Sequence, residues 1–215
     1  MSILTVALTG GIATGKSVVA KLLEQRGCYV HHADQAARNL MRPRSPAWRK
    51  IVRRFGPRVL RSDQTIDRTL LGKIIFADPR QREFLNRLIH PLVLAQKKRI
   101  IRRLEKKGSH RLFVSEAALT IEAGYSGFFD RVIVVHCPEE IQVRRLQERD
   151  KISRAGALRR IRSQMPGAEK VKHADYLIDS SGTIEETAAQ TQHVYRRLLS
   201  DYRAKQRRLA QGRPG

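Results

Sequence analysis

Short apolar runs alternate along the chain with longer stretches of helical spacing. Five such runs are candidate strands, and four of them are short, apolar and bounded by turn residues or charge, which is typical of buried parallel strands. These runs cover residues 3–8, 29–32, 112–115, 132–136 and 176–178. Because helical spacing fills the intervals, the sequence predicts an α/β fold with three layers, α/β/α, in which helices cover both faces of a five-stranded parallel sheet.

The interval between the second and third predicted strands is unusually long, from about residue 34 to residue 110. We expect its helical stretches to be broken at prolines, namely Pro43, Pro46, Pro57, Pro79 and Pro91. A single crossover helix does not need so many residues, so we predict an inserted helical region over residues 35–110. The remaining predicted strands and their helices form a core made of residues 1–34, 111–140 and 174–200.

A glycine-rich segment joins the first predicted strand to the helical stretch that follows it. The segment Gly10-Gly11-Ile12-Ala13-Thr14-Gly15-Lys16-Ser17 fits the pattern G-x-x-x-x-G-K-[ST]. Strand, glycine turn and helix N-terminus are the context of a phosphate-binding loop, or P-loop, whose backbone N–H groups point at an anion. Lys16 is expected to reach the terminal phosphates, and the Ser17 hydroxyl to ligate Mg²⁺. We therefore expect a nucleoside triphosphate to bind at Gly10, Gly11, Ile12, Ala13, Thr14, Gly15, Lys16, Ser17 and Val18.

The net charge of +23 is large, but by itself it does not show whether the protein binds nucleic acid or a small polyanion. Such a charge is often the footprint of a nucleic-acid-binding protein, but it also attracts polyanionic small molecules such as ATP. Lys and Arg are spread along the chain, and the dense run over residues 97–107 has the spacing of an amphipathic helix with a solvated basic face. Aromatic residues make up only 6%, which argues against a stacking surface for nucleic acid. The basic tail, residues 201–215, lacks a clear apolar stripe, and we expect it to fray.

Neither a membrane span nor a disulfide framework is indicated. No apolar run approaches the ~20 residues that cross a bilayer. Cys28 and Cys137 lie beside predicted strands and have no metal-ligand spacing, so we expect buried thiols in a reducing compartment. The sequence therefore predicts a cytoplasmic protein.

Acidic residues follow two of the predicted strands, where open α/β sheets bind their ligands. Asp34 follows the second strand and Glu116 follows the third. A carboxylate in either place is suited to accept a proton from an attacking hydroxyl or to help hold the metal. Asp34 is equally suited to cap the helical stretch that comes next, and spacing does not separate the two roles. His31 and His32 point to opposite faces of a strand, so they do not form one metal site.

An arginine-rich interval over residues 141–173 is predicted to form a helical lid. Arg145 and Arg149 are four residues apart and share a helix face, and Arg160 lies further along. Phosphoryl transfer uses cations that close over the developing charge, although a solvated basic helix would show the same spacing. The D-x-x-G at Asp179–Gly182 follows the last strand, and a guanine-reading tetrapeptide is absent from the sequence, which argues against a GTPase.

Taken in order, several motifs resemble those of the dephospho-CoA kinase family. The loop L-T-G-G-I-A-T-G-K-S is followed by H-A-D-Q-A-A-R ending at Arg38, and then by L-N-x-x-x-H-P with His90. R-x-x-x-R-D begins at Arg145, R-I-x-x-Q-M-P begins at Arg160, and A-D-x-x-I-D-x-S-G begins at Ala174. These segments keep family-like spacing from residue 4 to about residue 200.

The resemblance implies an ATP- and Mg²⁺-dependent kinase that phosphorylates the ribose 3′-hydroxyl of dephospho-CoA, the last step of coenzyme A synthesis. Carried over by motif, Asp34 becomes the catalytic base, and the region over residues 35–110 becomes the substrate-binding region. Arg38, His90 and Glu116 join Asp34 at the substrate. Lys16, Arg145 and Arg149 join it in catalysis, and Arg149 and Arg160 bind ATP.

Three departures from the family pattern accompany the resemblance. His32 stands where the family has an aspartate, Ala13 and Thr14 replace Gly-Ser in the loop, and the segment from Glu116 to Glu122 lacks the family's proline. Another small-metabolite or nucleoside kinase is the alternative within enzymes. A basic nucleic-acid-binding P-loop ATPase is the alternative from another class. The sequence leaves open whether the chain is a monomer or a small homo-oligomer.

Overall fold

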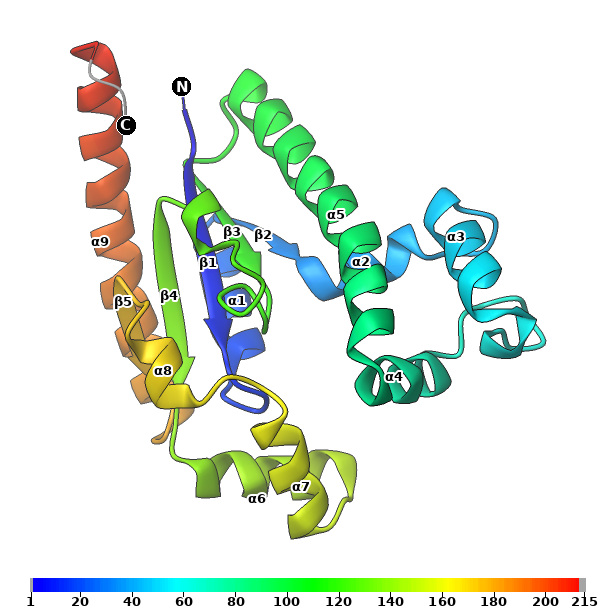
Figure 1. Ribbon diagram of the computed structural model, residues 1–215. Helices are drawn as coiled ribbons and strands as arrows, with labels where there is room; N and C mark the ends of the chain where they lie inside the picture. The colour runs from blue at the N-terminus through cyan, green and yellow to red at the C-terminus, as the bar shows by residue number, and fades with distance from the viewer. Residues whose placement is uncertain (1, 213–215) are drawn as a thin grey trace. The chain divides into compact units, whose positions relative to one another are not determined.

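A parallel sheet organises the chain in the computed structural model, which describes residues 2–212 (Figure 1). Its five strands lie in the order β2-β3-β1-β4-β5, and every adjacent pair is parallel. The strands are β1 (Leu4–Gly10), β2 (Tyr29–His32), β3 (Leu112–Glu116), β4 (Arg131–His136) and β5 (Tyr176–Asp179). The α/β fold with a five-stranded parallel sheet is thereby confirmed, and the predicted strand positions agree to within two residues.

The chain divides into two compact units. Unit 1 consists of residues 1–32 and 103–215, and unit 2 of residues 33–102. The helices of unit 1 are α1 (Lys16–Gln25), η2 (Ser126–Phe128), α6 (Glu139–Asp150), α7 (Arg154–Arg162), α8 (Gly167–Val171) and α9 (Ile184–Ala210). Those of unit 2 are α2 (Ala33–Leu40), α3 (Pro46–Phe55), η1 (Pro57–Val59) and α4 (Arg68–Ala77), while α5 (Pro79–Lys107) has residues in both. The segment over residues 141–173, expected to be a lid, falls within unit 1.

Alternating side chains of β1 form the main core of unit 1. Leu4, Val6 and Leu8 are fully buried and pack in one cluster with Leu23 of α1 and Leu198 of α9. Alternate residues of a strand point to one face, so this period-two pattern directs every second side chain toward the two helices. Each such side chain contributes about 1.5–3 kcal/mol through burial, which fixes β1 in the centre of the sheet.

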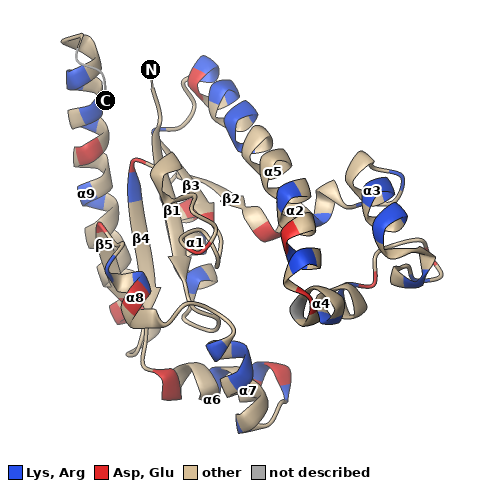
Figure 2. Cartoon of the chain, viewed as in Figure 1, with Lys and Arg blue, Asp and Glu red and all other residues tan. Residues whose placement is uncertain are grey.

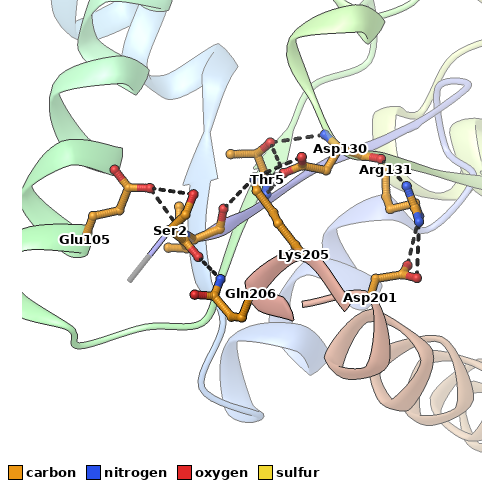
Figure 3. A network of polar contacts seen from close by, with 9 residues as sticks. Ser2, Thr5, Glu105, Asp130, Arg131, Asp201, Lys205 and Gln206 are labelled. Carbon is orange, nitrogen blue, oxygen red and sulfur yellow. Dashed lines mark hydrogen bonds and ion pairs between the residues drawn. The ribbon is translucent and has the colours of Figure 1, made fainter. Parts of the chain in front are cut away.

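Hydrogen bonds attach the last turns of the C-terminal helix α9 to the segments that precede β1 and β4. Lys205 donates hydrogen bonds to the Ile3 carbonyl at 3.1 Å and to Asp130 at 2.7 Å, and Gln206 donates to the Ser2 carbonyl at 2.6 Å (Figure 3). Burial acts to raise the pKa of Asp130, but the bonds from Lys205 and Thr5 outweigh it and hold that pKa below its ordinary value. The prediction that residues from 201 onward fray is therefore wrong as far as Ala210, where α9 ends. Residues 213–215 lie outside the described part of the chain.

Unit 2 has a small hydrophobic core of its own, made of Ile51, Phe55, Val59, Ile66 and Leu71. Two of its helices, α3 and α4, begin where a side chain accepts hydrogen bonds from the first N–H groups. Ser45 caps α3 by accepting from Trp48 N, with Pro46 at the first helical position, and Asp67 caps α4 by accepting from Thr69 N and Leu70 N.

The expectation that Pro91 breaks a helix is wrong, because α5 continues through it from Pro79 to Lys107. A proline inside a helix removes one backbone donor, here the bond to the carbonyl of Arg87, and crowds that carbonyl. Ile89 and Leu104 are buried on either side of it. Their burial favours a continuous helix and outweighs the loss of a single backbone bond.

Both cysteines are free thiols, and burial raises the pKa of Cys28 to about 12 and raises that of Cys137 as well. A helix long and apolar enough to cross a membrane is absent from the described residues 2–212.

Candidate active site

The loop between β1 and α1 has the backbone shape that the glycine pattern predicts. Gly10 has φ +151°, and a Cβ there would lie 2.2 Å from the carbonyl oxygen of Val135, so only glycine fits. Gly15 has φ +81° in the left-handed region and precedes the first residue of α1. Ala13 has φ +60°, also in the left-handed region, where a residue with a Cβ is strained. The position where the resemblance expects glycine therefore keeps a glycine-like conformation.

Side chains from two other segments hold this loop in place. Gln164, between α7 and α8, accepts a hydrogen bond from the Ile12 N–H at 2.8 Å. Gln142 of α6 donates to the Ile12 carbonyl at 2.7 Å. Within the loop, Thr14 Oγ1 and Lys16 Nζ donate to the Gly11 carbonyl at 2.9 and 2.8 Å. The Lys16 ammonium therefore lies across the loop, and it is the group suited to meet a terminal phosphate there.

Arg145 connects the loop to the turn after β5 through hydrogen bonds. Its guanidinium donates to the Ser180 carbonyl at 2.6 Å and to the Ala13 carbonyl at 3.4 Å. The Ser180 hydroxyl in turn donates to the Thr14 carbonyl at 2.7 Å, and Ser180 is buried. Sequence spacing predicts Arg145 as one of a pair of lid arginines. The structure instead places its guanidinium on backbone carbonyls beside the loop.

Arg149 and Arg160, the other two predicted lid arginines, meet at Asp150. Arg149 Nε donates to Asp150 at 2.8 Å, and Arg160 makes an ion pair with the same carboxylate from α7. The hydrogen bond from Arg149 is the main reason that the pKa of Asp150 lies below its ordinary value. Both arginine side chains remain substantially exposed, Arg149 at 59% and Arg160 at 49%. They therefore keep donor N–H groups available on the solvent side.

Ser17, Glu116 and His32 form a short polar chain at the end of the sheet. The Ser17 hydroxyl donates to Glu116 Oε1 at 3.1 Å, and His32 Nδ1 lies 2.5 Å from Glu116 Oε2. His32 and Glu116 are neighbours because β2 pairs with β3 at that register. A serine hydroxyl beside a carboxylate is an oxygen donor set that fits Mg²⁺. His31 is buried while His32 is exposed, so the two imidazoles point to opposite faces as predicted.

A cavity of 630 Å³ adjoins the loop within unit 1. Gly11, His136, Gln142, Gln164 and Lys170 contribute to its lining. Lys170 is fully buried, and its ammonium donates to Glu122 at 2.6 Å and to the Ala118 carbonyl at 2.7 Å. A buried lysine paired in this way fixes α8 to the segment after β3.

Asp34, Arg38 and His90, the predicted substrate residues of the helical region, belong to unit 2. Asp34 lies in the first turn of α2, which begins at Ala33, and its side chain is exposed. The alternative that Asp34 caps the helix from outside is therefore wrong. A carboxylate in the first turn still interacts favourably with the helix dipole. Arg68 interacts electrostatically with Asp34 and Arg38, and Lys97 with Asp34 and His90.

Sequence reasoning missed several of these contacts. Gln164 stands inside the Q-M-P motif and Ser180 inside the D-x-x-G turn, but neither pattern indicates a bond to the phosphate loop. Gln142 and Lys97 lie in helices without a distinguishing motif. For Lys97 one signal was present, because it follows His90 by seven residues and therefore shares its helix face. A group of three or more His, Cys, Asp or Glu residues suited to hold a metal is absent from residues 2–212.

Comparisons with known proteins agree on one family. A family model described as dephospho-CoA kinase matches residues 4–186. The dephospho-CoA kinase of Syntrophus aciditrophicus is 38% identical over 209 residues, which cover 97% of this chain and 89% of that protein. The one from Carboxydothermus hydrogenoformans is 43% identical over 185 residues, covering 86% and 89%. The solved dephospho-CoA kinase from Campylobacter jejuni superimposes with a TM-score of 0.65 at 28% identity, over 89% of this chain and 95% of that one.

Proposed function

The chain belongs to the dephospho-CoA kinase family, and from this membership we propose that it transfers the terminal phosphate of ATP to the ribose 3′-hydroxyl of dephospho-CoA. In the proposed reaction the 3′-oxygen forms a bond to the γ-phosphorus, the bond to the ADP oxygen breaks, and the proton of the hydroxyl leaves to a base. The observation that carries the proposal is the match of the family model over residues 4–186.

The geometry of the loop supports the ATP half of this reaction. Backbone N–H groups at a helix N-terminus favour anions, and Lys16 adds a cation whose attraction to the phosphate grows as charge moves onto the transferring group. Ser17 and Glu116 supply the oxygen ligands that would hold Mg²⁺, which neutralises phosphate charge when it is bound. The exposed guanidinium groups of Arg149 and Arg160 are available for phosphate oxygens.

Asp34 is the proposed base for the 3′-hydroxyl. Its carboxylate is exposed and lies among cationic side chains of unit 2. An exposed carboxylate that meets a hydroxyl group is suited to accept its proton. Arg38 and His90 are proposed to contact the acceptor in the same unit. A cytoplasmic location stays a prediction, and so does a monomeric or small homo-oligomeric state.

The decisive experiment is detection of coenzyme A by mass spectrometry after the protein is incubated with ATP, Mg²⁺ and dephospho-CoA. We expect a mass gain of one phosphoryl group on dephospho-CoA and stoichiometric ADP. Parallel reactions contain adenosine or RNA in place of dephospho-CoA. Turnover with adenosine alone would favour the nucleoside-kinase alternative, and ATP hydrolysis that only RNA stimulates would favour the nucleic-acid alternative.

Two lysine variants in α1 calibrate this assay. Lys16→Ala removes the loop cation and is expected to lower the rate on the order of 10²-fold or more. Lys21→Ala removes an exposed lysine of the same helix and is expected to keep the wild-type rate. Equal rates for the two variants would contradict the phosphate-binding role of Lys16.

A further inference from the structure

Glu116, the last residue of β3, is held at both of its carboxylate oxygens. Its Oε1 accepts a hydrogen bond of 3.1 Å from the Ser17 hydroxyl, and His32 Nδ1 lies 2.5 Å from its Oε2. An ionised carboxylate only accepts hydrogen bonds, so the ring nitrogen that faces it carries the proton. Both the neutral Nδ1–H tautomer and the imidazolium ion carry that proton, and the donor role of His32 therefore does not depend on the charge of the ring.

The backbone makes His32 and Glu116 neighbours. β2 and β3 are adjacent parallel strands, and their register pairs His32 with Glu116 at the end of both strands. Side chains paired across adjacent strands project to the same face of the sheet, so the imidazole meets the carboxylate directly. Ser17, His32 and Glu116 all belong to unit 1.

The two side chains differ in exposure. That of His32 is 49% exposed, whereas that of Glu116 is only 14% exposed. Water therefore replaces a lost hydrogen-bond partner of Glu116 less readily than one of an exposed group. Removal of the donor at Oε2 releases that oxygen, and the carboxylate can then turn away from the Ser17 hydroxyl. The contact between Ser17 and Glu116 is thus stabilised by His32.

The orientation of Glu116 matters for a metal ion at the loop. Lys and Arg recur along α7 and α9 of unit 1, and such groups attract the phosphates of a nucleotide but repel a metal cation (Figure 2). A hard divalent cation takes oxygen ligands, and a carboxylate adds the negative charge that compensates it. Ser17 and Glu116 can act together on such a cation only while their oxygens lie side by side.

We propose that His32 is a positioning residue for the metal of the phosphate loop. By donating to Oε2 it keeps Oε1 of Glu116 beside the Ser17 hydroxyl, where the two oxygens can hold a divalent cation. This inference rests on the proposed function, in which Mg²⁺ accompanies ATP. It gives a task to the residue that stands in place of the family's aspartate: the imidazole orients the metal-binding carboxylate and does not add a second negative charge.

The test separates the contribution of the metal from that of the loop. Titration calorimetry measures the Kd for ADP in Mg²⁺ and in EDTA, and the ratio of the two values reports how much the metal strengthens nucleotide binding. We expect a gain in affinity with Mg²⁺ for the wild-type protein. His32→Leu should remove most of this gain, up to roughly tenfold, as for other losses of a partner of a metal-binding carboxylate. The Kd in EDTA should stay near the wild-type value, because the loop and Lys16 are unchanged.

His32→Asn is the conservative variant that distinguishes a hydrogen-bond donor from a packing group. The amide nitrogen of asparagine is attached to Cγ, as Nδ1 of histidine is, so it can donate to Oε2 from a similar position. It should therefore restore a large part of the gain with Mg²⁺. Leucine keeps more of the bulk of the ring but has no donor, so a role in packing predicts the opposite order of the two variants.

His193→Leu is the matched control, since it makes the same change at an exposed position of α9. It should keep the wild-type Kd in Mg²⁺ and in EDTA. The proposal would be overturned by a wild-type protein without a gain from Mg²⁺, by an unchanged gain in His32→Leu, or by a loss in His32→Asn as large as in His32→Leu. Formation of coenzyme A by the wild-type protein is assayed in parallel. Any of these results with coenzyme A formed rejects this inference alone, whereas absence of coenzyme A would reject the proposed function.

Discussion

Arg145 donates a hydrogen bond of 2.6 Å to the carbonyl oxygen of Ser180, and its second amino group reaches the Ala13 carbonyl in the phosphate loop. A planar guanidinium can serve two carbonyls at once, whereas a lysine ammonium serves them less well from a shorter, unforked side chain. Arg145→Lys should therefore loosen the loop and raise the KM for ATP by roughly tenfold. Steady-state kinetics with varied ATP check this.

The neighbouring Arg144 provides the control for that measurement. Arg144→Lys makes the same exchange at an exposed position of α6 and should leave the KM for ATP unchanged. If Arg145→Lys behaves like Arg144→Lys, the contacts to Ala13 and Ser180 do not shape the nucleotide site.

Ala13→Gly is expected to keep or raise stability. The left-handed φ of +60° costs a residue with a Cβ about 1–2 kcal/mol, and glycine removes that cost while adding about 0.5–1 kcal/mol of backbone entropy. The free energy of unfolding in urea should therefore be unchanged or higher by up to about 1 kcal/mol. Ala20→Gly, at a buried position inside α1, should instead lower it by about 1 kcal/mol. Equal losses in the two variants would show that Ala13 is not strained.

Asp34→Asn tests the proposed base. The amide keeps the shape of the side chain but accepts no proton, so turnover should fall by roughly 10²–10⁴-fold while the KM for ATP changes little. Asp63→Asn, in an exposed turn of the same unit, controls for loss of a negative charge and should keep the wild-type rate. Full activity of Asp34→Asn would place the base elsewhere.

The stability of the protein should also depend on Lys97. Its pKa is about 8 in the folded chain and 10.5 ordinarily, so the unfolded state holds that proton more tightly. The buried ammonium therefore lowers the free energy of unfolding most below about pH 8. This destabilisation becomes smaller as the pH rises toward 10.5. Lys97→Met should raise the free energy of unfolding by about 1–3 kcal/mol at pH 7, and this gain should shrink by pH 10. Lys98→Met should change it by less than about 0.5 kcal/mol at either pH. A gain for Lys97→Met that is independent of pH would contradict the buried-charge explanation.

The strands and the phosphate loop could be predicted because their signals are local. A buried parallel strand is apolar on both faces, and the loop needs glycine at Gly10 and Gly15 wherever the rest of the chain lies. The family resemblance, which the comparisons confirm, depends on the same kind of short motif.

The errors concern features that distant residues decide. Residues 201–210 look unattached in the sequence, but Lys205 meets Asp130 and Gln206 meets Ser2, partners that no local pattern indicates. Pro91 looks like a helix breaker until burial on both sides of it is known. Lys97 resembles the solvated lysine beside it because both belong to one basic run, and only the packing of other helices separates them.

The central position of β1 has a consequence for the order in which the protein assembles during synthesis. β1 leaves the ribosome well before its neighbours on either side, residues 112–116 and 131–136. At about 5–20 residues per second, those partners follow on the order of ten seconds later. In that interval residues 33–102 emerge complete and can close their own small core. The nucleotide loop at the end of β1 gains its final shape only when Val135 arrives beside Gly10, so an early-made segment is completed late.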